Sequence, residues 1–139
     1  MNSIRRFACL GSDDRALLLN AALSLMVARL GLWFLPWRSA IRMMRSLRIP
    51  GRVQFTAARA AWAIGNASRL VPRATCLTQA LALHHMLSRA GYVCRLQFGV
   101  AKDGSDFEAH AWVEHEDKPL LNSAAELTRY SRLLTLENF

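Results

Sequence analysis

The stretches TCLTQALALHHMLSRAG, residues 75–91, and YVCRLQFGV, residues 92–100, decide the fold of this chain. Thr75 is a good N-cap and Gly91 a good helix end, so we expect a helix over residues 76–90. Apolar residues then recur at every second position, which predicts a strand over residues 93–100. The inward face of the helix would contain Cys76, Ala80, Leu83 and Leu87.

The residues after this strand predict a hairpin. Asp103-Gly104-Ser105 has turn chemistry, and residues 107–115 alternate again, with His110 and Trp112 on the same side. We expect a second turn at residues 117–119 and a short strand over 120–122. A short helix over residues 124–134 would end the domain.

The residues before Pro72 predict three helices, over residues 14–30, 37–48 and 53–70, with Gly31 and Pro36 ending the first. In the second helix Ile41, Met44 and Leu47 share one side, and Arg38, Arg42 and Arg45 share another. The fold class is therefore α+β, with helices first and a small antiparallel sheet last. We expect a single domain over 1–139, with a helical part at 1–71 and a catalytic core at 72–139.

Composition and charge restrict the partners and the compartment. The chain has 139 residues, 53% of them hydrophobic, which is enough for one core. Its three cysteines, Cys9, Cys76 and Cys94, show neither a disulfide framework nor zinc-ligand spacing, so we expect the cytoplasm. The net charge of +8 predicts an anionic partner: an acidic peptide, a nucleic acid or an anionic membrane surface.

The most apolar segment, residues 16–35, is not expected to cross a membrane. Its longest charge-free run, residues 16–28, has 13 residues, whereas a bilayer needs about 20. Arg5 and Arg6 are followed by Gly11-Ser12-Asp13-Asp14 instead of an apolar stretch, so we expect no secretion signal. We interpret the segment as a buried or partner-facing helix.

Cys76 is the candidate nucleophile. A thiol in the first turn of a helix faces unpaired N–H groups and the positive end of the helix dipole, which stabilise a thiolate and could hold an oxyanion. Position alone also fits a small buried residue. His110, in the middle of a strand, is the candidate base, because His84 lies eight residues, roughly 12 Å, further along the helix of Cys76.

A cysteine nucleophile also needs a group that orients its base. We expect Asn122, since a hairpin that turns near Glu116 would place residues 110 and 122 opposite each other; Asp117 is the alternative. Gln79 could donate to an oxyanion, and Trp112 could wall the site, although a solvated glutamine and a packing tryptophan are as reasonable. Cys94 fits an inert core position. We expect no metal site, because His110 and His115 lie on opposite strand faces, and no cofactor.

Several motifs together resemble a known family. They are PRATCLTQALAL (residues 72–83), RAGY (89–92), FGV (98–100) and AHAWVE (109–114), in this order and spacing. The chain resembles the transglutaminase-like leader peptidases of lasso-peptide biosynthesis. The resemblance implies a transglutaminase-like, papain-like core and a cysteine peptidase that removes the leader of a ribosomally made precursor. Cys76 and His110 carry over as nucleophile and base, and the third residue, commonly aspartate, falls at or next to Asn122.

The resemblance also implies partners. They are the precursor's leader, a separate leader-recognition protein and a lasso cyclase. The amino-terminal helices carry more large apolar side chains than they can bury, and Arg29, Arg38, Arg42 and Arg45 would rim them. We expect these helices to dock the leader together with the recognition protein.

Two alternatives stay open. The same Cys-His pair could pass the acyl group to an amine, as a transglutaminase or acyltransferase. The chain could instead be a non-catalytic basic module that binds nucleic acid or anionic lipid, with Cys76 inert.

Overall fold

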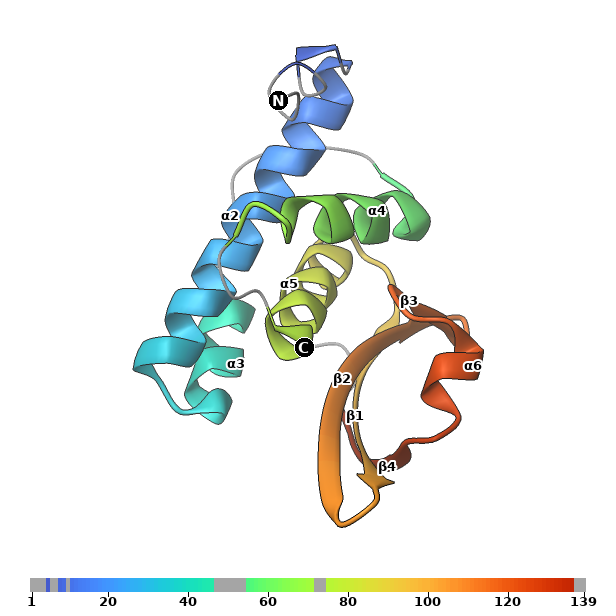
Figure 1. Cartoon of the computed structure of the whole chain (residues 1–139). Helices are drawn as coiled ribbons and strands as arrows, with labels where there is room; N and C mark the ends of the chain where they lie inside the picture. Colours follow the sequence, from blue (N-terminus) through green and yellow to red (C-terminus); the bar gives the residue numbers. More distant parts are fainter. Residues whose placement is uncertain (1–4, 6–7, 10, 47–54, 72–74, 137–139) are drawn as a thin grey trace.

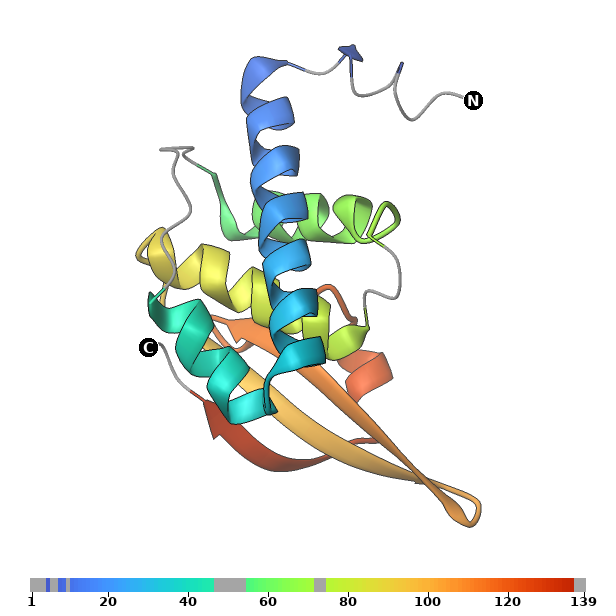
Figure 2. The same cartoon turned by 90° about the vertical axis from the view of Figure 1, so that its left-hand side faces the viewer.

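The computed structural model describes residues 5, 8–9, 11–46, 55–71 and 75–136. Within these ranges the chain forms four helices followed by four antiparallel strands, with a fifth, short helix inserted before the last strand (Figure 1). The expected α+β class is confirmed. The helical layer covers one face of the sheet, and the other face carries the short helix α6 (Figures 1 and 2).

The first described helix, α2 (Ser12–Phe34), is longer than the predicted 14–30. It runs through Gly31, which is buried against the next helix: a Cβ there would lie 2.5 Å from Cε of Met43 and 3.6 Å from Cβ of Ala40. The glycine thus permits close helix packing and does not end the helix. The helix ends at Leu35, whose backbone is extended ahead of Pro36.

The next two helices follow the predicted pattern over shorter ranges. They are α3 (Trp37–Ser46) and α4 (Ala57–Ala67), the latter capped by the Thr56 hydroxyl, which accepts from the Arg59 N–H. In α3 Ile41 and Met44 are buried and Arg38 and Arg42 are exposed, as expected. The predicted extensions over residues 47–48 and 53–54, and with them Leu47, lie outside the described residues.

Helix α5 (Cys76–Arg89) forms the centre of the molecule and confirms the predicted 76–90 closely. The Thr75 hydroxyl caps it by accepting from the N–H of Thr78. Helix α2 crosses over α5 on the side away from the sheet (Figure 2). Nearly every residue of α5 after its first turn is buried, including His84 and His85, which are therefore packing histidines.

The sheet has the order β3-β2-β1-β4. Strands β1 (Cys94–Asp103) and β2 (Asp106–His115) form the predicted hairpin, paired from Cys94 opposite His115 to Asp103 opposite Asp106. One face of the hairpin, with Leu96, Ala111 and Val113, packs into the core beneath α5. The side chains at the alternating positions of both strands, His110 and Trp112 among them, point to the outer face of the sheet.

Two predictions about the end of the chain are wrong. The second turn lies at Glu116 and Asp117, both with positive φ, so β3 is Lys118–Leu120 instead of 120–122. The predicted helix over 124–134 is replaced by α6 (Ala124–Leu127) and strand β4 (Ser131–Leu136), which pairs with β1. Because Leu133 and Leu134 are adjacent, the sequence here has no clear strand period, and the open edge of β1 decides the structure.

Candidate active site

Cys76 is the first residue of α5, as the nucleophile hypothesis requires. Its side chain is partly buried, and it makes no hydrogen bond to any residue that the structure describes. The first-turn N–H groups of a helix have no partner further back in the helix, so this end of α5 offers donors to an anion. These N–H groups are placed to hold the oxyanion that would form when the Cys76 sulfur attacks a carbonyl group.

His110 lies in the middle of β2, on the outer face of the sheet, opposite Gly99 of β1. The glycine leaves space for the Trp112 indole, since a Cβ on Gly99 would lie 2.9 Å from Cη2 of Trp112. The imidazole of His110 stacks on Tyr130, with 5.2 Å between ring centroids, and lies 6.0 Å from the Trp112 ring. The Tyr130 and Trp112 rings therefore hold the histidine in one orientation.

A cavity of about 430 Å³ opens beside His110. Strand β2, helix α6 and the residues on either side of α6 line it: Glu108, His110, Asn122, Ala125, Glu126, Leu127, Arg129 and Tyr130. The lining combines an imidazole with carboxylates, an amide and an aromatic ring. A peptide segment could be bound there by hydrogen bonds and stacking.

The structure does not bring Cys76 and His110 into hydrogen-bond contact. The core face of β2 meets α5, whereas His110 points to the opposite face, and its Nε2 is buried without a hydrogen-bond partner. However, β3 pairs only with residues 113–115 of β2. The part of β2 before Val113, which includes His110, therefore has no described strand on that side. Among the described residues, this part of β2 is paired with β1 alone.

Asn122 lines the same cavity as His110, but not for the predicted reason. Pairing with β2 ends at Leu120, and Leu121 then takes a positive φ of 71°, so residues 110 and 122 are not hairpin partners. No hydrogen bond joins Asn122 to His110 in the structure. The alternative, Asp117, forms an ion pair with Arg95 near the far end of β2 and does not line the cavity.

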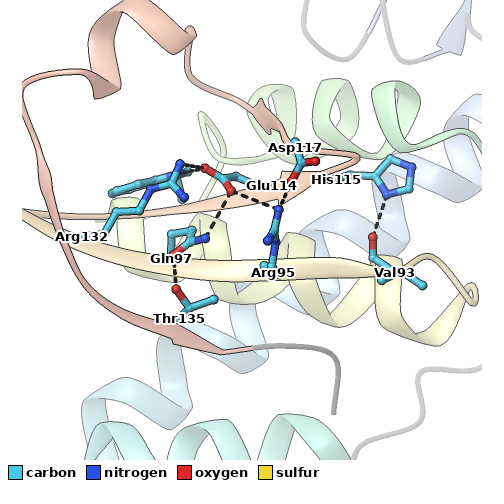
Figure 3. Close-up of polar contacts among 9 residues, drawn as sticks. Val93, Arg95, Gln97, Glu114, His115, Asp117, Arg132 and Thr135 are labelled. Atoms are coloured by element: carbon cyan, nitrogen blue, oxygen red, sulfur yellow. Dashed lines mark hydrogen bonds and ion pairs between the residues drawn. The ribbon is translucent and has the colours of Figure 1, made fainter.

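The outer face next to His110 is held together by a buried carboxylate (Figure 3). Glu114 is 3% exposed and accepts hydrogen bonds from Nε1 of Trp112 at 3.1 Å, Nε2 of Gln97 at 3.2 Å and the Arg132 guanidinium at 2.7 Å. The hydroxyl of Thr135 donates to Gln97 in turn. Through Arg132 and Thr135, this network ties β4 to the hairpin and fixes the indole that packs beside His110.

Of the remaining predicted residues, Trp112 belongs to the site and Cys94 to the core. Trp112 is buried on the His110 face and does pack against the site. Burial raises the pKa of the Cys94 thiol to about 11, so this cysteine stays protonated and unreactive. Gln79 is partly buried one turn after Cys76, so its role at an oxyanion stays a prediction. Among the described residues no group of three His, Cys, Asp or Glu side chains could hold a metal ion.

Three residues of the site were not predicted from the sequence: Glu108, Arg129 and Tyr130. Arg129 bridges Glu108 on β2 and the Tyr130 hydroxyl, so it joins the end of α6 to the site strand. Glu108 shares the side of His110 in the strand pattern, which was a usable signal. Tyr130 had none, because its segment was expected to be helical.

Comparison with known proteins supports the superfamily to which the motifs point. The family model described as transglutaminase-like superfamily matches residues 22–135, which include Cys76, His110 and Asn122. The searches of curated proteins and of solved structures find no match. Members of this superfamily are usually enzymes that use a catalytic cysteine. Because the match spans most of the chain and the fold agrees with it, this protein belongs to the transglutaminase-like superfamily.

Proposed function

We propose that this protein is a cysteine peptidase that removes the leader segment from a ribosomally made lasso-peptide precursor. The observation that carries the proposal is the location of Cys76 at the start of α5 in a chain that matches the transglutaminase-like superfamily. The aromatic setting of His110 beside a cavity supports it. The choice of a lasso-peptide precursor as substrate rests on the resemblance of the sequence motifs.

The proposed reaction is acyl transfer through a thioester. The Cys76 thiolate attacks the scissile carbonyl carbon, and the oxyanion is held by N–H groups at the start of α5. His110, protonated by the thiol, gives its proton to the leaving amine as the C–N bond breaks. His110 then takes a proton from water, which attacks the thioester and releases the acid and the free thiol.

This reaction requires Cys76 and His110 to come within hydrogen-bond distance of each other. The unpartnered Nε2 of His110 is the atom that would accept the thiol proton. Catalytic hydrogen bonds are often long in a substrate-free enzyme and shorten when the substrate binds. A peptide bound in the cavity would press on the His110 ring from the outer face, and Asn122 would orient the ring.

Three partners belong to the proposal. The leader of the precursor is the substrate, and a separate recognition protein would deliver it, followed by the cyclase that closes the ring. We place this work in the cytoplasm, where free thiols persist.

Thiol reactivity and cleavage test the proposal. At pH 6, iodoacetamide should alkylate Cys76 faster than Cys9, an exposed cysteine that serves as the internal reference, and mass spectrometry separates the two sites. Cys76→Ala and His110→Ala should each abolish cleavage of a leader-bearing precursor while circular dichroism stays unchanged. Cys94→Ala is the control for a cysteine outside the site and should still cleave.

The outcomes separate the candidate reactions. If Cys76→Ala or His110→Ala cleaves near the parent rate, the site assignment is wrong. If the parent joins the precursor to an added amine and releases no free acid, the enzyme is a transferase that uses the same residues. A Cys76 that reacts no faster than Cys9 supports an inert binding module instead.

A further inference from the structure

From Leu19 onward, the outer surface of α2 and of the turn into α3 exposes mainly apolar side chains. The exposed large side chains from residue 19 to residue 37 are Leu19, Leu23, Met26, Leu30, Trp33, Phe34, Leu35 and Trp37, which we call the apolar stripe. On α2 they recur every three or four residues, so they share one side of the helix. From Leu19 to Trp33 they extend over about 21 Å.

The opposite side of α2 is buried against the rest of the protein. Its buried residues, Leu17, Ala21, Ser24, Leu25, Ala28 and Gly31, face the rest of the protein, and α2 packs on α4 and α5. By length and composition α2 could cross a membrane, but spanning would remove this packing from the core. The helix therefore has one face for the protein and one face for something outside it.

The aromatic end of the stripe projects most. Trp33 is 69% and Phe34 74% exposed, and their rings stack at 5.5 Å. Figure 2 shows α2 and α3 as the outermost layer in front of α5. The cavity of about 430 Å³ lies elsewhere, and no residue of α2 or α3 lines it. A projecting aromatic cluster on an outer layer suits insertion into a soft surface better than it suits a rigid partner.

The charged residues of the segment that carries the stripe are all basic. No aspartate or glutamate occurs between Arg15 and Lys102, a segment that contains 13 arginines and lysines. The guanidinium of Arg29 lies over Trp33 at 5.8 Å and that of Arg38 over Trp37 at 5.3 Å. Within the described part of the chain, Arg29, Arg38 and Arg42 form no ion pair. A second copy of this surface would be repelled, so its occupant must be anionic.

We propose that the apolar stripe and its arginines bind an anionic membrane surface, with α2 lying in the interface and the Trp33-Phe34 end inserted. Aromatic rings at headgroup depth and arginines on lipid phosphates are the chemistry that such a surface recognises. The inference goes beyond the proposed peptidase and does not depend on it. It would hold the catalytic domain at the membrane while the cavity on the far side of the sheet stays in water.

Vesicle flotation tests the proposal. The full chain should float with vesicles of three parts phosphatidylcholine to one part phosphatidylglycerol, should not float with phosphatidylcholine alone, and should be released by high salt. Alkaline carbonate should also release it, since α2 lies on the bilayer; retention would indicate a spanning helix and overturn the proposal. Cys76→Ala should bind like the parent, which separates this surface from the enzyme activity.

Matched variants locate the surface. Arg38→Gln with Arg42→Gln should weaken binding about 25-fold, from about fivefold for each arginine near an anionic surface. Trp33→Ala with Phe34→Ala should weaken it at least about tenfold. Phe107→Ala is the control for the aromatic pair because Phe107, in the β1-β2 hairpin, is also 74% exposed, and Arg69→Gln is the control for the arginine pair.

Besides retention in alkaline carbonate, three results would overturn the proposal. They are equal binding to neutral vesicles, equal losses in the control variants, and no binding to either vesicle. If vesicles fail to bind while cleavage with the recognition protein requires Trp33 and Phe34, the stripe is a protein-docking surface, as expected from the sequence.

Discussion

Replacing His84 by glutamine should reduce the loss of stability that this protein undergoes on acidification. His84 lies inside α5 with no exposed surface, and burial lowers its pKa from 6.5 to about 4. A hydrogen bond to the backbone of Cys94 opposes this shift, and the neighbouring His85 adds slightly to it. The histidine is therefore neutral in the folded protein over a pH range in which it is charged in the unfolded chain.

The sign and the magnitude follow from this difference. Above pH 6.5 the residue is neutral in both states, so it adds no pH dependence. As the pH falls from 6.5 towards 4, only the unfolded chain takes up the proton, and the free energy of unfolding decreases. A difference of about 2.5 pKa units corresponds to at most about 3 kcal/mol, and the loss levels off below pH 4.

Urea unfolding at a series of pH values, followed by circular dichroism, measures this effect. His84→Gln should carry a constant packing penalty, but its free energy of unfolding should fall by about 3 kcal/mol less than that of the parent between pH 7 and pH 4. Leu87→Met, at a buried position of the same helix without an ionisable group, is the control for a packing penalty alone and should keep the slope of the parent. Parallel curves for the parent and His84→Gln would refute the reasoning.

Three further substitutions test the outer face of the sheet. Gly99→Ala should destabilise the protein by about 1–3 kcal/mol in urea unfolding, because a Cβ would meet the Trp112 ring at 2.9 Å and a backbone oxygen at 3.0 Å; an unchanged midpoint would contradict this packing. Glu114→Leu should cost about 3–5 kcal/mol, since the donors on Trp112 and Gln97 lose their acceptor, and a cost below 1 kcal/mol would show that water replaces it. Asn122→Ala should slow precursor cleavage by less than the roughly 10²–10⁴-fold expected for loss of a base, and full activity would assign the orienting role to another residue.

The proposed peptidase and the membrane surface lie on different layers of the molecule. The cavity beside His110 is on the outer face of the sheet, and the apolar stripe is on the far side of the helical layer. A protein bound through α2 could therefore still receive a peptide at the sheet. This separation allows either function to be removed by substitution while the other is measured.

Features that depend on neighbours in the sequence were predicted well. Helix α5 has its cap, its period and its stop within residues 75–91, and the β1-β2 hairpin has two alternating stretches joined by Asp103-Gly104-Ser105. Local rules were sufficient for both. The exposed apolar side chains of α2 were also expected, because the residues in 1–71 exceed what one small sheet can cover.

Features that depend on distant residues were not predictable. From the sequence, Gly31 was predicted to end the first helix. In the structure it lies inside α2, where α3 packs closely against it. The residues of β4 were predicted to be helical, and only their pairing with the edge of β1 makes them a strand. Asn122 reaches the cavity by a left-handed turn at Leu121, after a β3 that is shorter than expected.

The sequence by itself determined the α+β class, the helix start at Cys76 and the strand of His110, because caps and periods act within a few residues. Only the tertiary structure decided that His110 lies on the outer face of the sheet, stacked on Tyr130 and away from the packing of α5. Alternation along a strand tells which side chains share a face, but not which face a helix will cover. That choice depends on the burial of Ala111 and Val113 against residues more than 20 positions earlier in the chain.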